Sequence, residues 1–324
     1  MATVSILIPA HRPQFVAEAI ASALAQTFAD IEVLVGDNTS NGALEPIVRQ
    51  FESPKLKYFH HGFDNGGDNA RALWAKASGK YVKWLYYDDV LMPTSVEKLV
   101  QAMQTYPQAL MAFHERALID ATGAVVQTPP HLLNDGQIGL MDRDFLVRGM
   151  IANMHNFVGE PSFIMLDKSR IDLDDMSFYK GHALEFLGDV GAYLAVAERG
   201  PIAVVGGYLG GFRKHGAQES ATESPIFSMG LVEWELFLRG EAADGRFSVK
   251  EILTAKQRLE QLYTGFAPRL PELHAFIEGL AELIDEPVHT LHASPRFQAN
   301  LAQVSAVVKT RVAAARVARA AIAA

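Results

Sequence analysis

The most informative stretch of this chain, residues 79–93, runs Gly79-Lys80-Tyr81-Val82-Lys83-Trp84-Leu85-Tyr86-Tyr87-Asp88-Asp89-Val90-Leu91-Met92-Pro93. A β-rich run ends here in two adjacent carboxylates, which are followed by a turn and a proline. In α/β proteins, ligands bind outside the carboxyl ends of the strands. Carboxylate oxygens suit Mg²⁺ or Mn²⁺, and these ions usually arrive carrying phosphates. The stretch therefore predicts a site for a metal–diphosphate substrate.

The flanking residues alternate strand and helix patterns, which is typical of a mostly parallel sheet. Apolar runs predict strands at 4–8, 31–35, 56–59, 81–85, 109–114, 162–166 and 202–212, and helical spacing predicts helices at 15–26, 44–51, 69–77, 94–106 and 188–199. Glycines and prolines mark 119–150 as loops, and the pattern beyond about residue 224 is helical. We predict an α/β domain over 1–225 and a helical C-terminal region over 226–324.

Composition narrows the class of protein. The chain has 324 residues, of which 49% are hydrophobic, and a net charge of -8, which argues against a nucleic-acid binder. It has no cysteine, which excludes disulfides, thiolate zinc sites and cysteine nucleophiles. We see neither a secretory signal nor an apolar run of the ~20 residues that a membrane-spanning helix needs. We therefore expect a cytoplasmic protein, soluble or attached peripherally at the inner face of the membrane.

The last segment, residues 301–324, is rich in Ala and Val. Its charges are all positive (Lys309, Arg311, Arg316 and Arg319), and Val304, Val308 and Val312 share one helical face. Two interpretations stay open. The segment is either a terminal helix packed on the domain or a basic amphipathic helix that contacts an anionic membrane or a partner, including a second copy of the chain.

Three segments together resemble the family 2 glycosyltransferases of bacterial type, which are inverting enzymes with the GT-A fold. They run from Val4 to Arg12, from Ala21 to Ser40 and from Ala77 to Asp89. Their order and spacing carry the resemblance, and matches at 156–162, 189–200 and 212–215 extend it. The resemblance implies a Rossmann-like nucleotide-binding sheet. It also implies metal-assisted transfer of a sugar, with inversion, from a nucleoside-diphosphate sugar to a hydroxyl acceptor.

The resemblance also implies a donor, an acceptor and a setting. A UDP-sugar is the first donor to expect, and the acceptor is a glycan, a lipid-linked glycan or a protein. Polysaccharide biosynthesis at the cell envelope is the implied process, and a divalent cation, Mn²⁺ or Mg²⁺, is the implied cofactor.

Nucleotide binding is assigned through the resemblance to the ends of the first strands. Pro9, Ala10 and His11 would wall the base, and Asp37 would accept hydrogen bonds from a uracil-like N–H or from ribose. Arg71 would contact the diphosphate or the base. Each has a structural alternative: a surface-loop His11, an Asx-turn at Asp37 and a solvated helix Arg71.

The metal is assigned to the acidic pair. Asp88 matches the second Asp of the family's Asp-x-Asp motif, which binds the cation bridging the diphosphate, while Tyr86 occupies the first Asp position. Asp89 would join the metal shell or orient the loop. Alternatively, the pair caps the helix that begins at Thr94. His215 would complete the metal shell or touch the diphosphate.

The general base is assigned to Asp189, at the start of a helix, where Gly188 replaces the Glu of the family pattern. A helix N-cap is the alternative for Asp189, and Glu185 is the alternative base. Arg213 or Lys214 would neutralise phosphate. Residues 156–162 would shape the sugar or acceptor pocket.

Two other functions stay open at this point. A nucleotidyltransferase of similar fold typically has a Gly-rich loop after the first strand, and residues 9–13 are not Gly-rich. A non-catalytic nucleotide-sugar-binding scaffold would explain the departures at Tyr86 and Gly188. A Rossmann dehydrogenase is disfavoured because no Gly-x-Gly-x-x-Gly follows the first strand.

Overall fold

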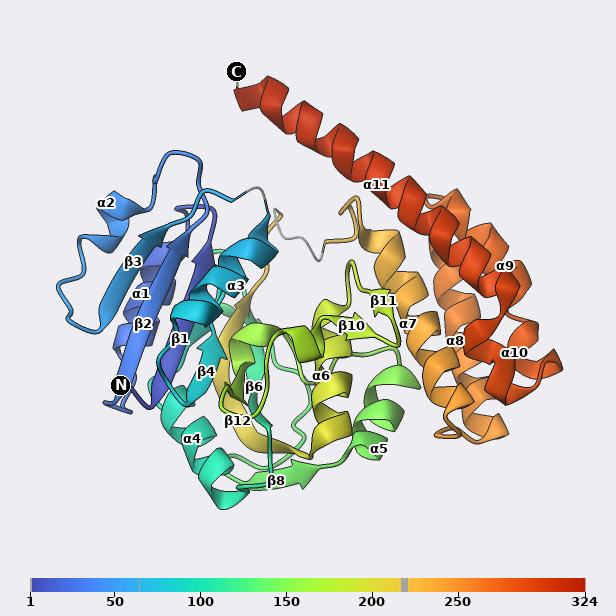
Figure 1. Cartoon of the computed structure of the whole chain (residues 1–324), viewed down its shortest axis with the longest axis horizontal. Helices are drawn as coiled ribbons and strands as arrows, with labels where there is room; N and C mark the ends of the chain where they lie inside the picture. Colours follow the sequence, from blue (N-terminus) through green and yellow to red (C-terminus); the bar gives the residue numbers. More distant parts are fainter. Residues whose placement is uncertain (1, 64, 217–220, 324) are drawn as a thin grey trace. The chain divides into compact units, whose positions relative to one another are not determined.

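The computed structural model describes residues 2–63, 65–216 and 221–323 and divides into two compact units (Figure 1). The first unit comprises Met1–Asp142, Val158–Met176 and Ala195–His215. The second comprises Arg143–Phe157, Ser177–Leu194 and Gly216–Ala324. The units interleave along the chain, and the single boundary expected near residue 225 stays a prediction.

The first unit is built on a central, mostly parallel sheet. Its path is β3 (Leu56–His60), β2 (Ile31–Asp37), β1 (Val4–Ala10), β4 (Tyr81–Trp84), β9 (Ile164–Asp167), β6 (Met111–Ile119), β12 (Ile202–Arg213) and β5 (Val90–Leu91), with β7 (Val125–Gln127) beside β6 and β8 (Ile138–Met141) beside β12. The strands from β3 to β4 are parallel, as are β6 and β12, whereas β9 runs antiparallel to both of its neighbours. The carboxyl ends of β1, β2 and β4 therefore meet at one edge.

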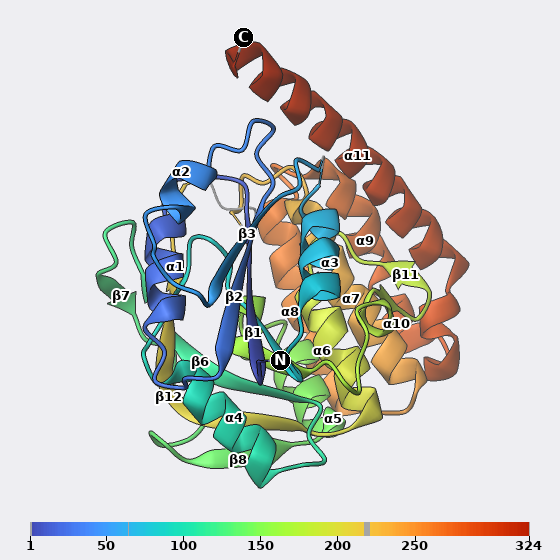
Figure 2. The ribbon, with the colours of Figure 1, turned by 60° about the vertical axis from the view of Figure 1, so that its left-hand side comes forward.

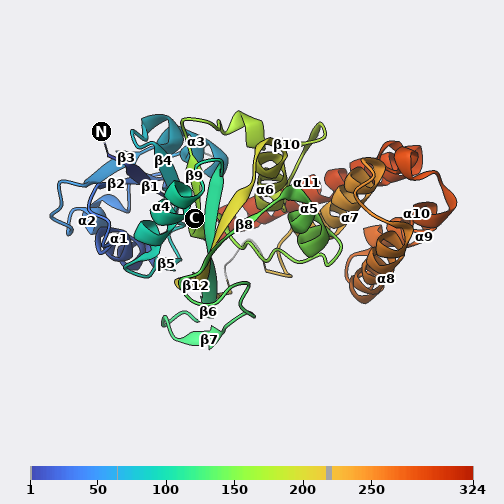
Figure 3. The same cartoon turned by 90° about the horizontal axis from the view of Figure 1, so that it is seen from below.

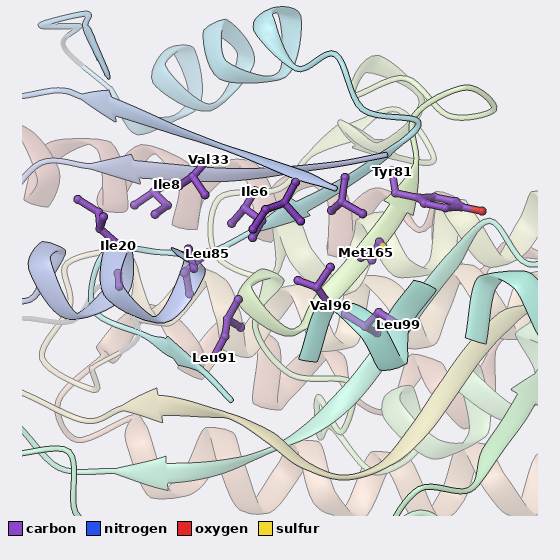
Figure 4. Close-up of a cluster of buried hydrophobic side chains, with 14 of the residues drawn as sticks. Ile6, Ile8, Ile20, Val33, Tyr81, Leu85, Leu91, Val96, Leu99 and Met165 are labelled. Atoms are coloured by element: carbon purple, nitrogen blue, oxygen red, sulfur yellow. The ribbon is translucent and has the colours of Figure 1, made fainter. Parts of the chain in front are cut away.

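Helices cover both faces of this sheet. Residues Ile6 and Ile8 of β1 face the helices α1 (Val16–Leu24) and α4 (Ser95–Thr105), which supply Ile20 and Leu99 to the same buried cluster (Figure 4). The alternate residues are also buried and face the opposite side, which α3 (Gly66–Lys76) covers with Leu73. Figure 2 shows α1 and α3 on opposite faces of the strands. The first unit also holds α2 (Glu45–Val48) and the short 3-10 helices Pro161–Phe163 and Asp174–Met176.

A glycine explains part of the third family-like segment. A Cβ on Gly79 would lie 2.7 Å from the backbone nitrogen of Ser5, a distance that side-chain-bearing residues do not tolerate. Only a glycine lets the chain enter β4 this close to β1.

A buried carboxylate ties the amino-terminal ends of the strands together. Glu32 accepts hydrogen bonds from the Ser5 hydroxyl at 2.7 Å, the Ser78 N–H at 2.8 Å and the Lys57 ammonium at 2.8 Å. Burial alone would raise the pKa of Glu32, but these hydrogen bonds outweigh it and lower the pKa to about 2. Glu32 therefore stabilises the sheet as an anion.

The second unit is mainly helical, which confirms the helical pattern beyond residue 224. Its elements are α5 (Arg143–Leu146), a π-helix (Val147–Ile151), the hairpin β10 (Phe178–Tyr179) and β11 (His182–Ala183), α7 (Phe227–Ala243), α8 (Val249–Phe266), α9 (His274–Gly279), α10 (Glu282–Asp285), the 3-10 helices Pro271–Leu273 and Val288–Ala293, and α11 (Pro295–Ala323). The helix α6 (Gly188–Arg199) has residues in both units. Figure 3 shows α7, α8, α9 and α10 gathered together.

Helix α7 is buried along nearly its whole length, and it carries charges into this interior. Glu235 accepts hydrogen bonds from Arg239 at 2.7 Å and from the Tyr263 hydroxyl at 2.8 Å. Glu241 is paired with Arg143 at 2.6 Å. Buried charges are tolerated only when they are paired in this way.

The segment 119–150 departs from the prediction of loops, because it contains β7, β8, α5 and the start of the π-helix. The residues of β7 are exposed, and β8 has one exposed, two half-buried and one buried residue, so that neither strand has a clear apolar alternation to reveal it. Pairing with β6 and β12 defines these strands instead.

The terminal helix α11 buries Val304 and Val308, and Arg311 forms an ion pair with Glu272. Packing on the domain is therefore confirmed for this part of the helix. The side chains of Arg316 and Arg319 lie outside the described residues. Among the helices that the structure describes, none is both long and apolar enough to cross a membrane. A membrane contact or a dimer through these helices stays a prediction.

Candidate active site

The structure brings the predicted metal-binding residues of the first unit together. Asp88 and Asp89 lie in the turn between β4 and β5, and His215 follows the end of β12. The Nε2 atom of His215 lies 3.0 Å from a carboxylate oxygen of Asp88. The side chains of Asp88 and His215 are 15% and 8% exposed, so both can still meet a ligand.

The two carboxylates of this acidic turn, residues 86–89, have different surroundings. Asp89 is buried, and its carboxylate accepts a hydrogen bond from the backbone N–H of Arg213 at 3.1 Å. Burial raises the pKa of Asp89 well above its usual value, and the charges of Asp88 and Glu160 add to the effect. Of the two roles suggested for Asp89, this setting favours orienting the loop.

Arg213 holds the acidic turn from inside. Its guanidinium is fully buried and donates to the backbone oxygen of Asp88 at 2.8 Å and to the Glu18 carboxylate at 2.6 Å. It also lies over the Phe15 ring, 4.5 Å from the centroid. Of the two candidates for neutralising phosphate, Arg213 and Lys214, the side chain of Arg213 holds the backbone that carries Asp88.

Three residues beside the acidic turn were missed or left without a role. The Ser162 hydroxyl accepts a hydrogen bond from the Tyr86 N–H at 2.9 Å. Arg116 pairs with Glu160 at 2.8 Å. Glu160 and Ser162 belong to the segment 156–162 that the sequence singles out, but nothing local in the sequence assigns their contacts.

The loop predicted to bind the nucleobase, residues 9–11, adjoins the acidic turn. Pro9 and Ala10 end β1, in register with Gly36 and Asp37 of β2. The ring of His11 packs edge-on against the ring of Tyr87, with 4.9 Å between centroids. The carboxyl ends of β1, β2 and β4 thus gather all of these residues at one edge of the sheet.

Asp37 is more constrained than the sequence suggests. It is fully buried, and its carboxylate accepts hydrogen bonds from the Thr39 N–H and hydroxyl, the Leu44 N–H and the Tyr58 hydroxyl, at 2.7 to 3.1 Å. Burial would raise the pKa of Asp37, but these donors outweigh it and lower the pKa. The Asx-turn is therefore present, and nucleotide binding by Asp37 stays a prediction.

Arg71 on α3 forms an ion pair with Asp174 at 2.6 Å, and both side chains are at least half exposed. Two residues earlier, Asn69 is buried and donates to the backbone oxygen of Gly36 at 2.9 Å. Asn69 therefore supports the carboxyl end of β2. Contact of Arg71 with the diphosphate stays a prediction.

In the second unit, Asp189 lies in the first turn of α6. Its carboxylate accepts hydrogen bonds from the Val190 N–H and from the side-chain amide of Asn156, both at 2.8 Å. Glu185, the alternative base, accepts a hydrogen bond from the Ser305 hydroxyl of α11 at 2.7 Å. Asn156 is thus a residue that the sequence placed near the pocket without a contact, and its partner is the candidate base.

The side chains at the acidic turn can be compared with the ligands that a divalent cation needs. Within residues 2–63, 65–216 and 221–323, no three His, Asp or Glu side chains gather as a ready-made metal site. Asp88 and His215 offer one carboxylate and one imidazole. Mg²⁺ is usually bound by one or two carboxylates together with substrate phosphates and water. The pair therefore fits a cation that arrives with a diphosphate.

Comparison with known proteins adds the family. Residues 5–135 match the model described as "Glycosyl transferase family 2". An uncharacterized glycosyltransferase of Rickettsia bellii is 37% identical over 105 residues, which cover 31% of this chain and only 15% of that protein. The UDP-Glc:alpha-D-GlcNAc-diphosphoundecaprenol beta-1,3-glucosyltransferase WfgD of Escherichia coli is 29% identical over 102 residues, covering 31% of this chain and 40% of that protein.

Solved structures extend the likeness of fold to most of the chain. The structure of S. aureus TarS 1-349 in complex with UDP-GlcNAc has a TM-score of 0.62 and 14% identity, and the alignment covers 97% of this chain and 91% of that one. This likeness identifies the fold as GT-A. Residues 5–135 are thus similar to glycosyl transferase family 2, and the likeness of fold extends over most of the chain.

Proposed function

We propose that this protein transfers a sugar from a nucleoside-diphosphate sugar, with UDP as the first nucleotide to test, to a hydroxyl acceptor with inversion. The observation that carries the proposal is the Asp88–His215 pair, 3.0 Å apart, beside the carboxyl ends of β1 and β2. The complex of TarS with UDP-GlcNAc supports a UDP-sugar as the donor.

The donor would be held by the first unit. Asp88 and His215 would hold Mn²⁺ or Mg²⁺, and the bound cation would offset the charge on the leaving nucleoside diphosphate. Asp89 and Arg213 would keep Asp88 in place, since both are buried and bonded to neighbouring backbone. Pro9, Ala10 and His11 would line the binding site of the nucleobase. Asp37 and Arg71 would contact the nucleotide.

The base would be Asp189. Its carboxylate would take the proton of the acceptor hydroxyl while that oxygen attacks the anomeric carbon opposite the diphosphate. The new glycosidic bond forms as the bond from the anomeric carbon to the diphosphate oxygen breaks. Asn156 would orient the carboxylate through its 2.8 Å hydrogen bond.

Among the possible acceptors, we propose a lipid-linked glycan in preference to a free glycan or a protein. The WfgD relative is named for a diphosphoundecaprenol-linked acceptor. An enzyme with such an acceptor would work in the cytoplasm at the inner face of the membrane, in polysaccharide biosynthesis.

A release assay tests the proposal. The protein is incubated with Mn²⁺ and a panel of UDP-, GDP- and dTDP-sugars, and nucleoside diphosphate is measured by luminescence. We expect release from one donor and no release without a divalent cation. Binding of a donor without release would favour the scaffold, and release of inorganic pyrophosphate from a sugar phosphate and a nucleoside triphosphate would favour a nucleotidyltransferase.

A further inference from the structure

One buried carboxylate of α7 holds the segment that leads into the candidate base. Glu233 is 1% exposed and accepts hydrogen bonds from three consecutive backbone N–H groups. The donors are Glu185 at 2.6 Å, Phe186 at 3.1 Å and Leu187 at 2.5 Å. Helix α6 begins at the next residue, Gly188, and Asp189 follows.

The physical chemistry of this contact is that of an anion in a nest of amides. Successive backbone N–H groups that converge on one point form a concave anion site, and N–H groups at the start of a helix otherwise lack partners. Hydrogen bonds to a charged acceptor are stronger than neutral ones. Burial raises the pKa of Glu233 to about 7 although the three N–H groups act to lower it, so the carboxylate is the charged, stronger acceptor above that pH.

Packing holds this segment on one side, and a cavity lies on another. The ring of Phe186 lies against α7 so closely that a Cβ on Gly230 would be 2.3 Å from it. On another side lies a cavity of about 190 Å³, lined by Glu185 and Glu233 together with residues of β11, α7 and α11. Besides the packing of Phe186 and a hydrogen bond from Ser305 to the Glu185 side chain, the three hydrogen bonds to Glu233 are the contacts that hold the backbone of residues 185–187 beside this cavity.

We propose that Glu233 is a positioning residue for the general base. It fixes the backbone of residues 185–187 and thereby the direction in which the Asp189 side chain points from the first turn of α6. The inference rests on the proposed function, in which Asp189 is the base. Glu235 and Glu241 of the same helix differ from Glu233, because they pair with the guanidinium groups of Arg239 and Arg143.

The test compares Glu233→Gln with the matched control Glu235→Gln, which alters an equally buried carboxylate two residues away. Hydrogen exchange is measured on the full chain by mass spectrometry. We expect exchange of the amides of residues 185–187 to rise at least about 10-fold in Glu233→Gln and to stay unchanged in the control. Unchanged exchange in Glu233→Gln would overturn the contact itself.

The kinetic arm uses nucleoside diphosphate release from the donor found in the panel. A displacement of about 1 Å can cost about 100-fold in rate, so we expect kcat to fall about 10- to 100-fold, with KM for the donor unchanged. Wild-type kcat together with faster exchange would overturn the positioning role. An inactive wild type would instead overturn the proposed function, and the positioning role with it, while the exchange arm would still decide whether Glu233 holds the segment.

A second variant covers a failure to fold. Glu233→Asp keeps the charge but is one carbon shorter, so it cannot reach all three N–H groups. We expect changes in the same direction and smaller, and wild-type values in both measurements would overturn the inference.

Discussion

The acidic turn of the first unit and the start of α6 in the second each carry a carboxylate with a proposed role, but they are held differently. The acidic turn is fixed by groups at the end of β12, the Arg213 guanidinium and the Arg213 N–H, and by the Ser162 hydroxyl in the 3-10 helix that leads into β9. The start of α6 is fixed by side chains from outside the sheet, Asn156 and Glu233. A sheet places its strand ends by topology, whereas a helix start depends on individual contacts.

If the acidic turn binds the donor, changing Asp88 should have the largest effect. We expect Asp88→Asn to lower nucleoside diphosphate release at least about 1000-fold, because several kcal/mol of charge stabilisation depend on the cation. Donor binding with Mn²⁺, measured by calorimetry, should weaken as well. Glu45→Gln, which alters an exposed carboxylate of the same unit paired with Arg49, serves as the control. Normal release by Asp88→Asn would contradict the site.

Changing Asp189 should separate the second region from the first. We expect Asp189→Asn to lower kcat about 100-fold or more, since general-base catalysis contributes about 10²- to 10⁴-fold, while the affinity for UDP and Mn²⁺ stays at the wild-type value. Calorimetry and release assays on the same preparation provide both numbers. Retention of wild-type transfer would show that another residue, with Glu185 first, is the base.

The buried anion Glu32 tests whether the sheet scaffold can be weakened without touching the chemistry. Its pKa is about 2 in the folded chain against 4.5 for an ordinary Glu, so its stabilisation is present above about pH 4.5 and is lost as the pH falls toward 2. We expect Glu32→Gln to lower the free energy of unfolding in urea at pH 7 by about 2–3 kcal/mol. The variant should also lose stability less steeply than the wild type on acidification.

Two further results would bear on that prediction. Glu45→Gln, in which only an exposed pair with Arg49 is altered, should change stability by less than about 1 kcal/mol. A large fall in kcat at 25 °C in Glu32→Gln would argue against a rigid acidic turn that is independent of the opposite end of the sheet.

Changing Asn156 tests how much the start of α6 depends on a single hydrogen bond. Its amide contributes one hydrogen bond to Asp189, and a bond to a charged group is worth about 1.5–3 kcal/mol. We expect Asn156→Ala to lower kcat about 10-fold with KM for the donor unchanged. A rise in KM with kcat unchanged would instead place Asn156 in substrate binding.

Much of the first region could be predicted from the sequence because its signals are local. The β-branched run before Pro9 indicates β1, and the apolar run that begins at Tyr81 indicates β4. In the second region the helix predicted over 188–199 also has the bounds of α6, but not the contacts that hold its start. The association of Asp88 with His215 followed from the resemblance. By contrast, β5 has only two residues, and its pairing with β12 is what defines it.

The rest could not be predicted because its signals are not local. In the sequence, Arg213 looks like any cationic residue beside a phosphate site. Only the fold shows that its guanidinium donates hydrogen bonds to backbone oxygen and to Glu18. Glu233 lies 46 residues beyond Leu187 on a helix without an amphipathic pattern, outside the residues that match the family model. A buried charge on such a helix is detectable only through its partners.

The smallest expected effect concerns the departure at Tyr86, which occupies the first Asp position of the family motif. Its side chain is 38% exposed, and its backbone N–H is held by Ser162, so the acidic turn keeps its path whatever the side chain. If the phenol replaces the missing carboxylate at the ribose, Tyr86→Phe removes one neutral hydrogen bond worth about 1 kcal/mol, and KM for the donor should rise about 5-fold with kcat unchanged. Release kinetics with the UDP-sugar and with its 2′-deoxy analogue check this. The variant should lose its disadvantage with the analogue, and an equal KM for Tyr86→Phe and wild type on both donors would rule out the ribose contact.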